Sequence, residues 1–145
     1  MFSNKLRKLV RDPKLFFSDM AANQARKLSK LHLKKEDGHY DYTVVSAVYN
    51  VSAFLDDYFK SFIHQRLKFK KHIQLILVDD GSTDNSGDII KKWQKKYPNN
   101  ITYFYQENAG QSAARNNGLQ HVASEWVTFI DPDDFVDADY FYNLD

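Results

Sequence analysis

The sequence contains no cysteine, and its apolar runs, such as LILV at residues 75–78, extend for only a handful of residues. The absence of cysteine excludes a disulfide scaffold, a thiolate zinc site and a cysteine nucleophile, and it favours a reducing cytoplasm as the compartment. The absence of a long apolar run leaves no candidate segment for crossing a bilayer. Residues 1–10 are basic and lack the apolar core of a signal peptide, so we expect a chain that is neither secreted nor processed.

The chain does contain enough apolar material for a packed domain. Of the 145 residues, 43% are hydrophobic, 15% aromatic and only 27% charged, which excludes wholesale disorder. The charge is unevenly distributed: residues 1–42 hold ten Lys or Arg and five Asp or Glu (net +5), and residues 43–145 hold ten and fourteen (net −4). We therefore predict a basic leader over residues 1–41, followed by an acidic globular part over residues 42–145.

The leader has a roughly helical spacing of leucine and phenylalanine among Lys and Arg, interrupted at Pro13. This pattern predicts two basic amphipathic helices, the second over about residues 13–33. One interpretation is peripheral attachment to an anionic membrane surface, where each basic residue near the headgroups contributes about 1 kcal/mol. The other is a helix packed on another part of the protein, with its charges simply solvated. The sequence leaves both interpretations open.

Beyond the leader, strand-like and helix-like patterns alternate. β-Branched and apolar runs predict strands over residues 42–48, 74–78, 101–105 and 126–130. Apolar residues at helical spacing predict helices over residues 53–65, 86–97 and 111–123, with Ser86 as an N-cap. This alternation implies right-handed crossovers, so the predicted fold class is α/β, with a mainly parallel, Rossmann-like sheet and helices on both faces.

Polar residues follow every predicted strand. They are Tyr49-Asn50, Asp79-Asp80-Gly81-Ser82, Glu107-Asn108-Ala109-Gly110 and Asp131-Pro132-Asp133-Asp134. Because ligands bind beyond the carboxyl ends of parallel strands, we expect these residues to share one rim. The five carboxylates that follow the second and fourth strands would repel one another on that rim, and a divalent metal is the simplest remedy. With oxygen ligands alone, Mg or Mn is favoured over zinc, and such a metal holds one or two carboxylates together with substrate phosphates.

The common phosphate-binding loops are missing. Neither G-x-x-x-x-G-K-[ST] nor G-x-G-x-x-G after a strand occurs, which excludes a P-loop and a dinucleotide fingerprint. The remaining way to hold a diphosphate at this rim is through a metal ion that bridges it to the carboxylates. Each acidic motif alone is also ordinary turn chemistry, so the hypothesis depends on their joint placement at one rim.

Four segments resemble the successive motifs of family 2 glycosyltransferases, which have the GT-A fold. They are VSAVYN (residues 45–50), LVDDGSTD (77–84), NAGQSAARNNG (108–118) and FIDPDD (129–134). Their order and spacing make the resemblance specific. It implies that residues 42–145 are the N-terminal, nucleotide-sugar-binding part of an incomplete GT-A domain, similar to bacterial transferases of capsule or surface polysaccharide synthesis.

The resemblance implies roles for four residues around the nucleobase. Tyr49 resembles the residue that packs on the base, and Asn50 lies beside it in the nucleotide-binding set. Asp80 resembles the carboxylate that recognises the edge of a uracil-type base, and Asp79 supports the loop that carries it.

The resemblance implies three further residues at the diphosphate. Asp131 and Asp133 resemble a D-x-D pair of metal-binding residues. Asp133 is the expected direct metal ligand, and Asp131 is expected nearer the ribose or a water on the metal. Arg115 resembles a residue that faces the nucleotide-sugar, and a guanidinium suits the geometry of a diphosphate.

The function that the resemblance implies is metal-dependent, inverting transfer of a sugar from a UDP-sugar to a polysaccharide or lipid-linked acceptor. The general base lies in the second half of the family's domain, so no catalytic residue is assigned here, and whether the 145 residues are active alone is an open question. The expected location is the cytoplasm, with peripheral contact at the inner face of the cell membrane.

Two other classes of protein stay open. One is a non-catalytic module that binds nucleotide-sugars or a partner protein. The other is a phospho-receiver domain, which needs a lysine after a later strand, and none follows Asp134. No nucleic-acid partner is expected, because the lysines that precede the second strand are not interleaved with stacking aromatic residues on a defined platform.

Overall fold

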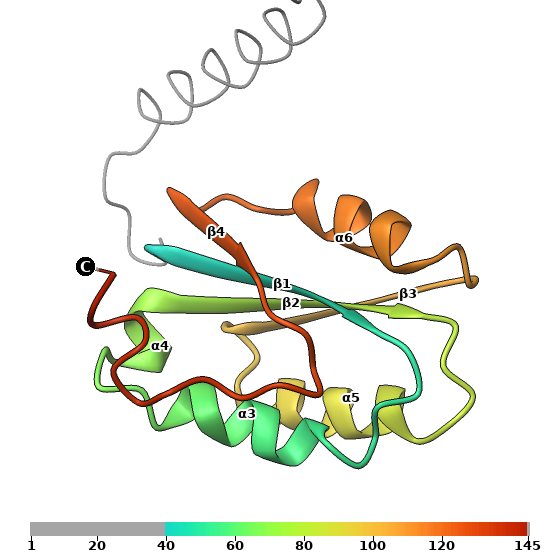
Figure 1. Cartoon of the computed structure of the whole chain (residues 1–145), viewed down its shortest axis with the longest axis horizontal. Helices are drawn as coiled ribbons and strands as arrows, with labels where there is room; N and C mark the ends of the chain where they lie inside the picture. Colours follow the sequence, from blue (N-terminus) through green and yellow to red (C-terminus); the bar gives the residue numbers. More distant parts are fainter. Residues whose placement is uncertain (1–39, 145) are drawn as a thin grey trace, which may run out of the picture. The chain divides into compact units, whose positions relative to one another are not determined.

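The computed structural model describes residues 40–144 (Figure 1). The predicted leader therefore lies outside the described residues, apart from its last two. Residues 40–144 belong to one compact unit. No helix within them is both long and apolar enough to cross a membrane.

Four parallel strands form the sheet. They are β1 (Tyr42–Val48), β2 (Ile73–Asp80), β3 (Ile101–Gln106) and β4 (Trp126–Phe129), and they lie in the order β3-β2-β1-β4. The two central strands, β1 and β2, are buried along nearly their whole length. Continuous apolar runs predict this burial, because both faces of a parallel sheet are covered. The parallel α/β sheet that the sequence predicts is therefore confirmed.

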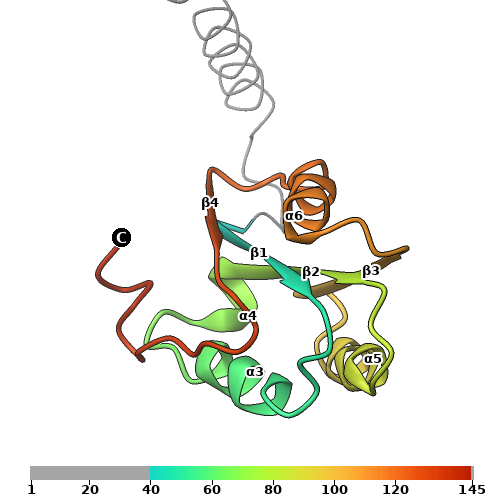
Figure 2. The ribbon, with the colours of Figure 1, turned by 45° about the vertical axis from the view of Figure 1, so that its right-hand side comes forward.

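Helices cover both faces of the sheet. In Figure 1, α3 (Leu55–Ile63), α4 (Phe69–His72) and α5 (Ser86–Lys96) lie below the sheet, and α6 (Gln111–Leu119) lies above it. Figure 2 shows the same two layers from another side. The buried residues of α3 are Leu55, Tyr58, Phe59 and Phe62. Their spacing of three, one and three residues is that of one helix face, which explains why this segment packs on the sheet as a helix.

Alternation along the strands creates two cores. Val44 and Val48 of β1 join the larger core, on the side of α3 and α5, and the intervening Val45 packs with Ala114 of α6 in the smaller one. Tyr42 and Phe62 both lie against Phe141, which draws the C-terminal segment over the larger core.

Some boundaries differ from the sequence prediction. β2 continues through Asp80 instead of ending at Val78, because its ladder with β3 extends to the pair Asp80–Gln106. Asp79 and Asp80 therefore point to opposite faces of the sheet. The prediction of Ser86 as an N-cap is wrong by one residue: Ser86 is the first residue of α5, and Asn85 is the N-cap. The single turn of α4 has no counterpart in the prediction.

Close packing of α6 on the sheet depends on a glycine. Gly118 is buried, and a Cβ atom at this position would lie 2.5 Å from Cγ1 of Val45 and 3.3 Å from Cγ2 of Val78. The first of these distances is too short for any carbon–carbon contact. Because valine side chains are stiff, they yield little when a methyl group is added.

We therefore expect Gly118→Ala to destabilise the fold. Overpacking outweighs the better helix propensity of alanine, for a net loss of about 1–2 kcal/mol in the free energy of unfolding. Urea unfolding measures this loss. Asn116→Ala, on the exposed side of the same helix, is the control and should not destabilise. Equal stability of Gly118→Ala and wild type would contradict the packing argument.

Candidate functional site

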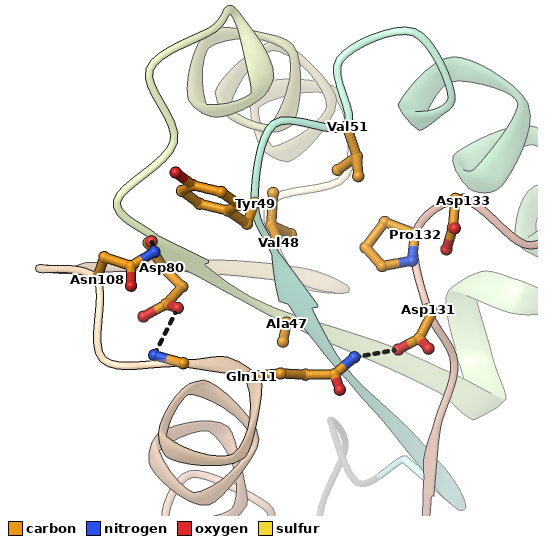
Figure 3. A pocket seen from close by; sticks show the side chains of 11 residues that line it. Ala47, Val48, Tyr49, Val51, Asp80, Asn108, Gln111, Asp131, Pro132 and Asp133 are labelled. Atoms are coloured by element: carbon orange, nitrogen blue, oxygen red, sulfur yellow. Dashed lines mark hydrogen bonds between the residues drawn. The ribbon is translucent and has the colours of Figure 1, made fainter.

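A cavity of about 360 Å³ lies at the carboxyl ends of the strands (Figure 3). Its lining comes from the end of β1 and the next residues (Ala47, Val48, Tyr49 and Val51), from Asp80, from the loop that leads into α6 (Asn108, Gly110 and Gln111), and from Asp131, Pro132 and Asp133 after β4. All four strand ends contribute, directly or through the following loop. The structure thus brings Asp80 and Asp133 to the same cavity, from elements far apart in the sequence.

Asp80 is buried and held by three donors from the last residue of β3 and the loop after it. Its Oδ1 accepts hydrogen bonds from the amide of Ala109 and from Nε2 of Gln106, each at 2.8 Å, and its Oδ2 accepts one from the amide of Gly110 at 2.9 Å. Gly110 has φ of 94°, a conformation that glycine adopts readily. Burial alone would raise the pKa of Asp80, but these hydrogen bonds outweigh it and hold the pKa below its usual range. Asp80 is therefore a carboxylate at neutral pH.

Asp79 supports the neighbouring loop and does not line the cavity. Its side chain accepts a hydrogen bond from the amide of Ser82 at 2.8 Å and another from the hydroxyl of Tyr103 at 2.9 Å. Only 2% of Asp79 is exposed. Of the two consecutive carboxylates, Asp80 alone reaches the cavity.

Asn50 joins the loop after β1 to the loop after β2. It has φ of 52°, and its side-chain oxygen accepts hydrogen bonds from the amides of Thr83 and Asp84 at 2.8 and 3.3 Å. Asp84 in turn accepts hydrogen bonds from the amides of Ser52 and Ser86. Burial opposes the ionisation of Asp84, but hydrogen bonds from both serines lower its pKa to about 2. Asn50 therefore ties the two loops together without lining the cavity, whereas Tyr49, which is half exposed, lines it.

Asp131 is paired with α6 through one of its two oxygens. Oδ1 accepts a hydrogen bond from Nη2 of Arg115 at 2.6 Å and a longer one from Nε2 of Gln111 at 3.3 Å. The Arg115 guanidinium also lies 5.6 Å from the centre of the Phe129 ring, and its buried Nε has no hydrogen-bond partner. Arg115 thus supplies positive charge beside the cavity without lining it. The ion pair between Arg115 and Asp131 relieves part of the repulsion among the carboxylates. From the sequence we expected a metal alone to relieve it.

On the β4 side of the cavity, the Asp133 carboxylate and Oδ2 of Asp131 are left for a ligand. Asp133 is exposed at the cavity, and no hydrogen bond or ion pair to either group is present within residues 40–144. Those residues contain no cluster of three or more His, Cys, Asp or Glu side chains placed to hold a metal. The side chains of residues 40–144 therefore do not supply a complete set of metal ligands. One or two carboxylates fit Mg or Mn when phosphate oxygens and water complete the coordination.

Sequence reasoning assigned no role to several residues of this site. Asn108, Gln111 and Pro132 line the cavity, and Gln106 holds Asp80. The side-chain amide of Asn108 also donates a hydrogen bond to the backbone oxygen of Asp80 at 3.0 Å. Asn108, Gln111 and Pro132 stand inside the motifs NAGQSAARNNG and FIDPDD, so the signal was present, but only tertiary contacts separate them from the other motif residues.

A parallel sheet with a polar cavity at its strand ends defines a ligand-binding α/β domain. The family model described as Glycosyl transferase family 2 matches residues 43–144. The chain therefore belongs to glycosyltransferase family 2, as its motifs predicted, and this membership removes the phospho-receiver alternative.

Two curated relatives come from bacteria. The minor teichoic acid biosynthesis protein GgaB of Bacillus subtilis is 41% identical over 112 residues, which cover 77% of this chain and 12% of that protein. The glycosyltransferase GlyA of Streptococcus pneumoniae is 44% identical over 102 residues, which cover 70% and 14%. The chain therefore spans only a small part of the length of these relatives.

Solved structures share the fold. S. aureus TarS 1–349 matches with a TM-score of 0.66 and 25% identity, covering 72% of this chain and 31% of that chain. Its complex with UDP-GlcNAc matches with a TM-score of 0.66 and 25% identity, covering 72% and 30%. The mannosyltransferase PcManGT of Pyrobaculum calidifontis, in complex with GDP-Man and Mn²⁺, matches with a TM-score of 0.65 and 23% identity, covering 83% and 37%. The described sheet and helices are thus GT-A-like, as expected.

Proposed function

We propose that this chain forms the donor site of a transferase that moves a sugar from a UDP-sugar, with Mg or Mn, to a polysaccharide or lipid-linked acceptor with inversion. The observation that carries the proposal is the arrangement of the cavity. A hydrogen-bonded carboxylate, Asp80, lies on one side, and the pair Asp131 and Asp133 lies on the other (Figure 3). Such a cavity suits a ligand with a base at one end and a diphosphate at the other.

The hydrogen bonds of Asp80 support a pyrimidine base. A carboxylate offers about four acceptor positions. The described contacts occupy two positions on Oδ1 and one on Oδ2. A single N–H, such as that of the uracil imide, completes this set, whereas the guanine edge would present more donors than the carboxylate can accept. Tyr49 supplies an aromatic face at the same wall.

The other wall supports a metal-bound diphosphate. Asp133 and Oδ2 of Asp131 would hold the ion, and Arg115 would keep Asp131 oriented. When bound, Mg or Mn neutralises charge on the diphosphate and stabilises it as a leaving group. The residues of this chain bind and orient the donor, and the base that deprotonates the acceptor is not assigned to any of them.

The relatives support a place in bacterial cell-surface synthesis. GgaB is named for teichoic acid biosynthesis, and an anionic membrane is the natural surface for a basic leader of net charge +5. We therefore propose that the transferase acts at the inner face of the cell membrane. A non-catalytic, nucleotide-sugar-binding module is the alternative, and a sugar-transfer assay with this chain and with any longer protein that contains it separates the two.

Calorimetry with UDP, with and without Mn, tests the donor site. We expect UDP to bind weakly without metal, and Mn to strengthen binding on the order of a hundredfold, because the ion contacts both the carboxylates and the diphosphate. GDP should bind less tightly than UDP under the same conditions. Failure of UDP to bind in both conditions would overturn the proposed function.

A further inference from the structure

A chain of buried hydroxyl groups lies beneath the segment that carries Asp131 and Asp133. The hydroxyl of Tyr58, on α3, lies 2.6 Å from Oγ of Ser46, on β1. The same Oγ lies 2.5 Å from the backbone oxygen of Ile130, the residue before Asp131. Tyr58 is 1% exposed and Ser46 is fully buried. Three elements therefore meet through two side-chain hydrogen bonds.

The direction of these hydrogen bonds follows from their chemistry. The oxygen of Ile130 only accepts, so Ser46 donates its single proton to it. Tyr58 must then donate to Ser46, although the distance alone allows either direction. Burial, together with the nearby charge of Asp131, raises the pKa of Tyr58, so the phenol keeps its proton. The chain thus runs from Tyr58 through Ser46 to the backbone of Ile130.

This contact occurs where the backbone ladder stops. Pairing between β1 and β4 ends at Val45 and Phe129, and the next residues on each strand are Ser46 and Ile130. β4 has only four residues, and Trp126, Val127 and Phe129 are between 43% and 56% exposed, so packing holds this edge strand weakly. The hydroxyl of Ser46 therefore adds a connection to the Ile130 carbonyl just past the last paired residues.

We propose that Ser46 and Tyr58 are positioning residues for the segment 131–133. By fixing the carbonyl of Ile130, they set where the Asp131 and Asp133 carboxylates stand relative to the base-binding side of the cavity. The value of this positioning for metal binding rests on the proposed function. Neither side chain lines the cavity, so neither acts on the donor directly.

The test compares Tyr58→Phe and Ser46→Ala with Ser61→Ala. Tyr58→Phe keeps the ring, which packs edge-on against Phe59 and Phe62, and removes only the donor. Ser61→Ala is a matched control, because Ser61 on the same helix donates to the backbone oxygen of Tyr58 and takes no part in the chain to Ile130. Uridine without metal and UDP with Mn are the two ligands.

We expect each of the first two variants to bind UDP with Mn about tenfold more weakly, the size found when outer residues that orient metal ligands are removed. Uridine affinity should stay within about twofold of wild type. The double variant should lose little more than either single variant, because both break one chain. Unchanged UDP affinity in both single variants, or an equal loss for uridine and UDP, would overturn the proposal.

Hydrogen exchange separates this proposal from the proposed function. The amide of Asp134 donates to the backbone oxygen of Asp131 at 3.0 Å and so reports on the order of the segment. Its exchange should speed up about tenfold or more in Tyr58→Phe and Ser46→Ala, while β2 amides and Ser61→Ala stay unchanged. If wild type fails to bind UDP, the proposed function fails, and the Asp134 amide still decides whether the hydroxyl chain positions the segment. Unchanged exchange there would overturn the positioning role.

Discussion

Asp133→Asn is expected to abolish the gain in UDP affinity that Mn provides. The amide is a much weaker ligand for a hard divalent ion than the carboxylate it replaces. Asp133 has no hydrogen bond or ion pair within residues 40–144, so its loss should leave the fold intact. Affinity for UDP in the presence of Mn should therefore fall to the metal-free value, a loss on the order of a hundredfold. Calorimetry with UDP at fixed Mn measures it.

Asp134→Asn is the matched control for this prediction. Asp134 is the adjacent exposed carboxylate and does not line the cavity. A general effect of negative charge near the site would weaken Mn-dependent binding in both variants. Direct coordination weakens it in Asp133→Asn alone. An Asp133→Asn protein with the full metal-dependent gain would disprove the assignment of Asp133 as a ligand.

Asp80→Asn is expected to damage both base recognition and stability. One carboxylate oxygen becomes an NH₂ group, which then faces a backbone amide or the Gln106 side chain in a site that is 4% exposed. A buried donor left without an acceptor costs about 1–3 kcal/mol of unfolding free energy. Uridine affinity should fall about tenfold to a hundredfold, since the base loses a charged acceptor.

Urea unfolding and metal-free uridine binding measure the two effects of Asp80→Asn. The pKa of Asp80 is lowered in the fold, so its contribution to stability is fully present at neutral pH and is lost as the pH falls below the ordinary aspartate value of about 4. The stability difference between wild type and Asp80→Asn should therefore shrink in acid. Glu107→Gln, an exposed carboxylate in the adjoining loop, should change neither quantity. Normal uridine affinity in Asp80→Asn would refute the base-binding role.

Several features of the fold were predictable from local patterns. β1 has the bounds that its β-branched run predicts, Tyr42–Val48. The alternation of strands and helices predicted a parallel sheet, because a helix between two strands returns the chain to the end of the sheet where the first strand began, so that the next strand runs in the same direction. Boundaries were less predictable: β2 extends through Asp80 because Gln106 of β3 pairs with it, and this partner is remote in sequence.

In the candidate site, too, some features were predictable from the sequence and others were not. Chain order places residues after each strand at one rim, so Tyr49, Asp80 and Asp133 could be chosen from the sequence. The separation of Asp79 from Asp80 could not, because both carboxylates fit a strand end equally well and only the extended ladder turns them to opposite faces. Ser46 looked like any residue of a buried strand, and its partner Tyr58 looked like any core aromatic.

By itself the sequence determined the order of strands and helices, the family and the rim where polar groups gather, because these depend on periodicity and on motifs contiguous in the chain. The tertiary structure alone decided which oxygen of each carboxylate is already occupied, that Arg115 pairs with Asp131, and that Tyr58 and Ser46 hold Ile130. The physical reason is that hydrogen bonds act over about 3 Å and are directional. Partners as far apart as residues 46 and 130 become neighbours only after the sheet has formed.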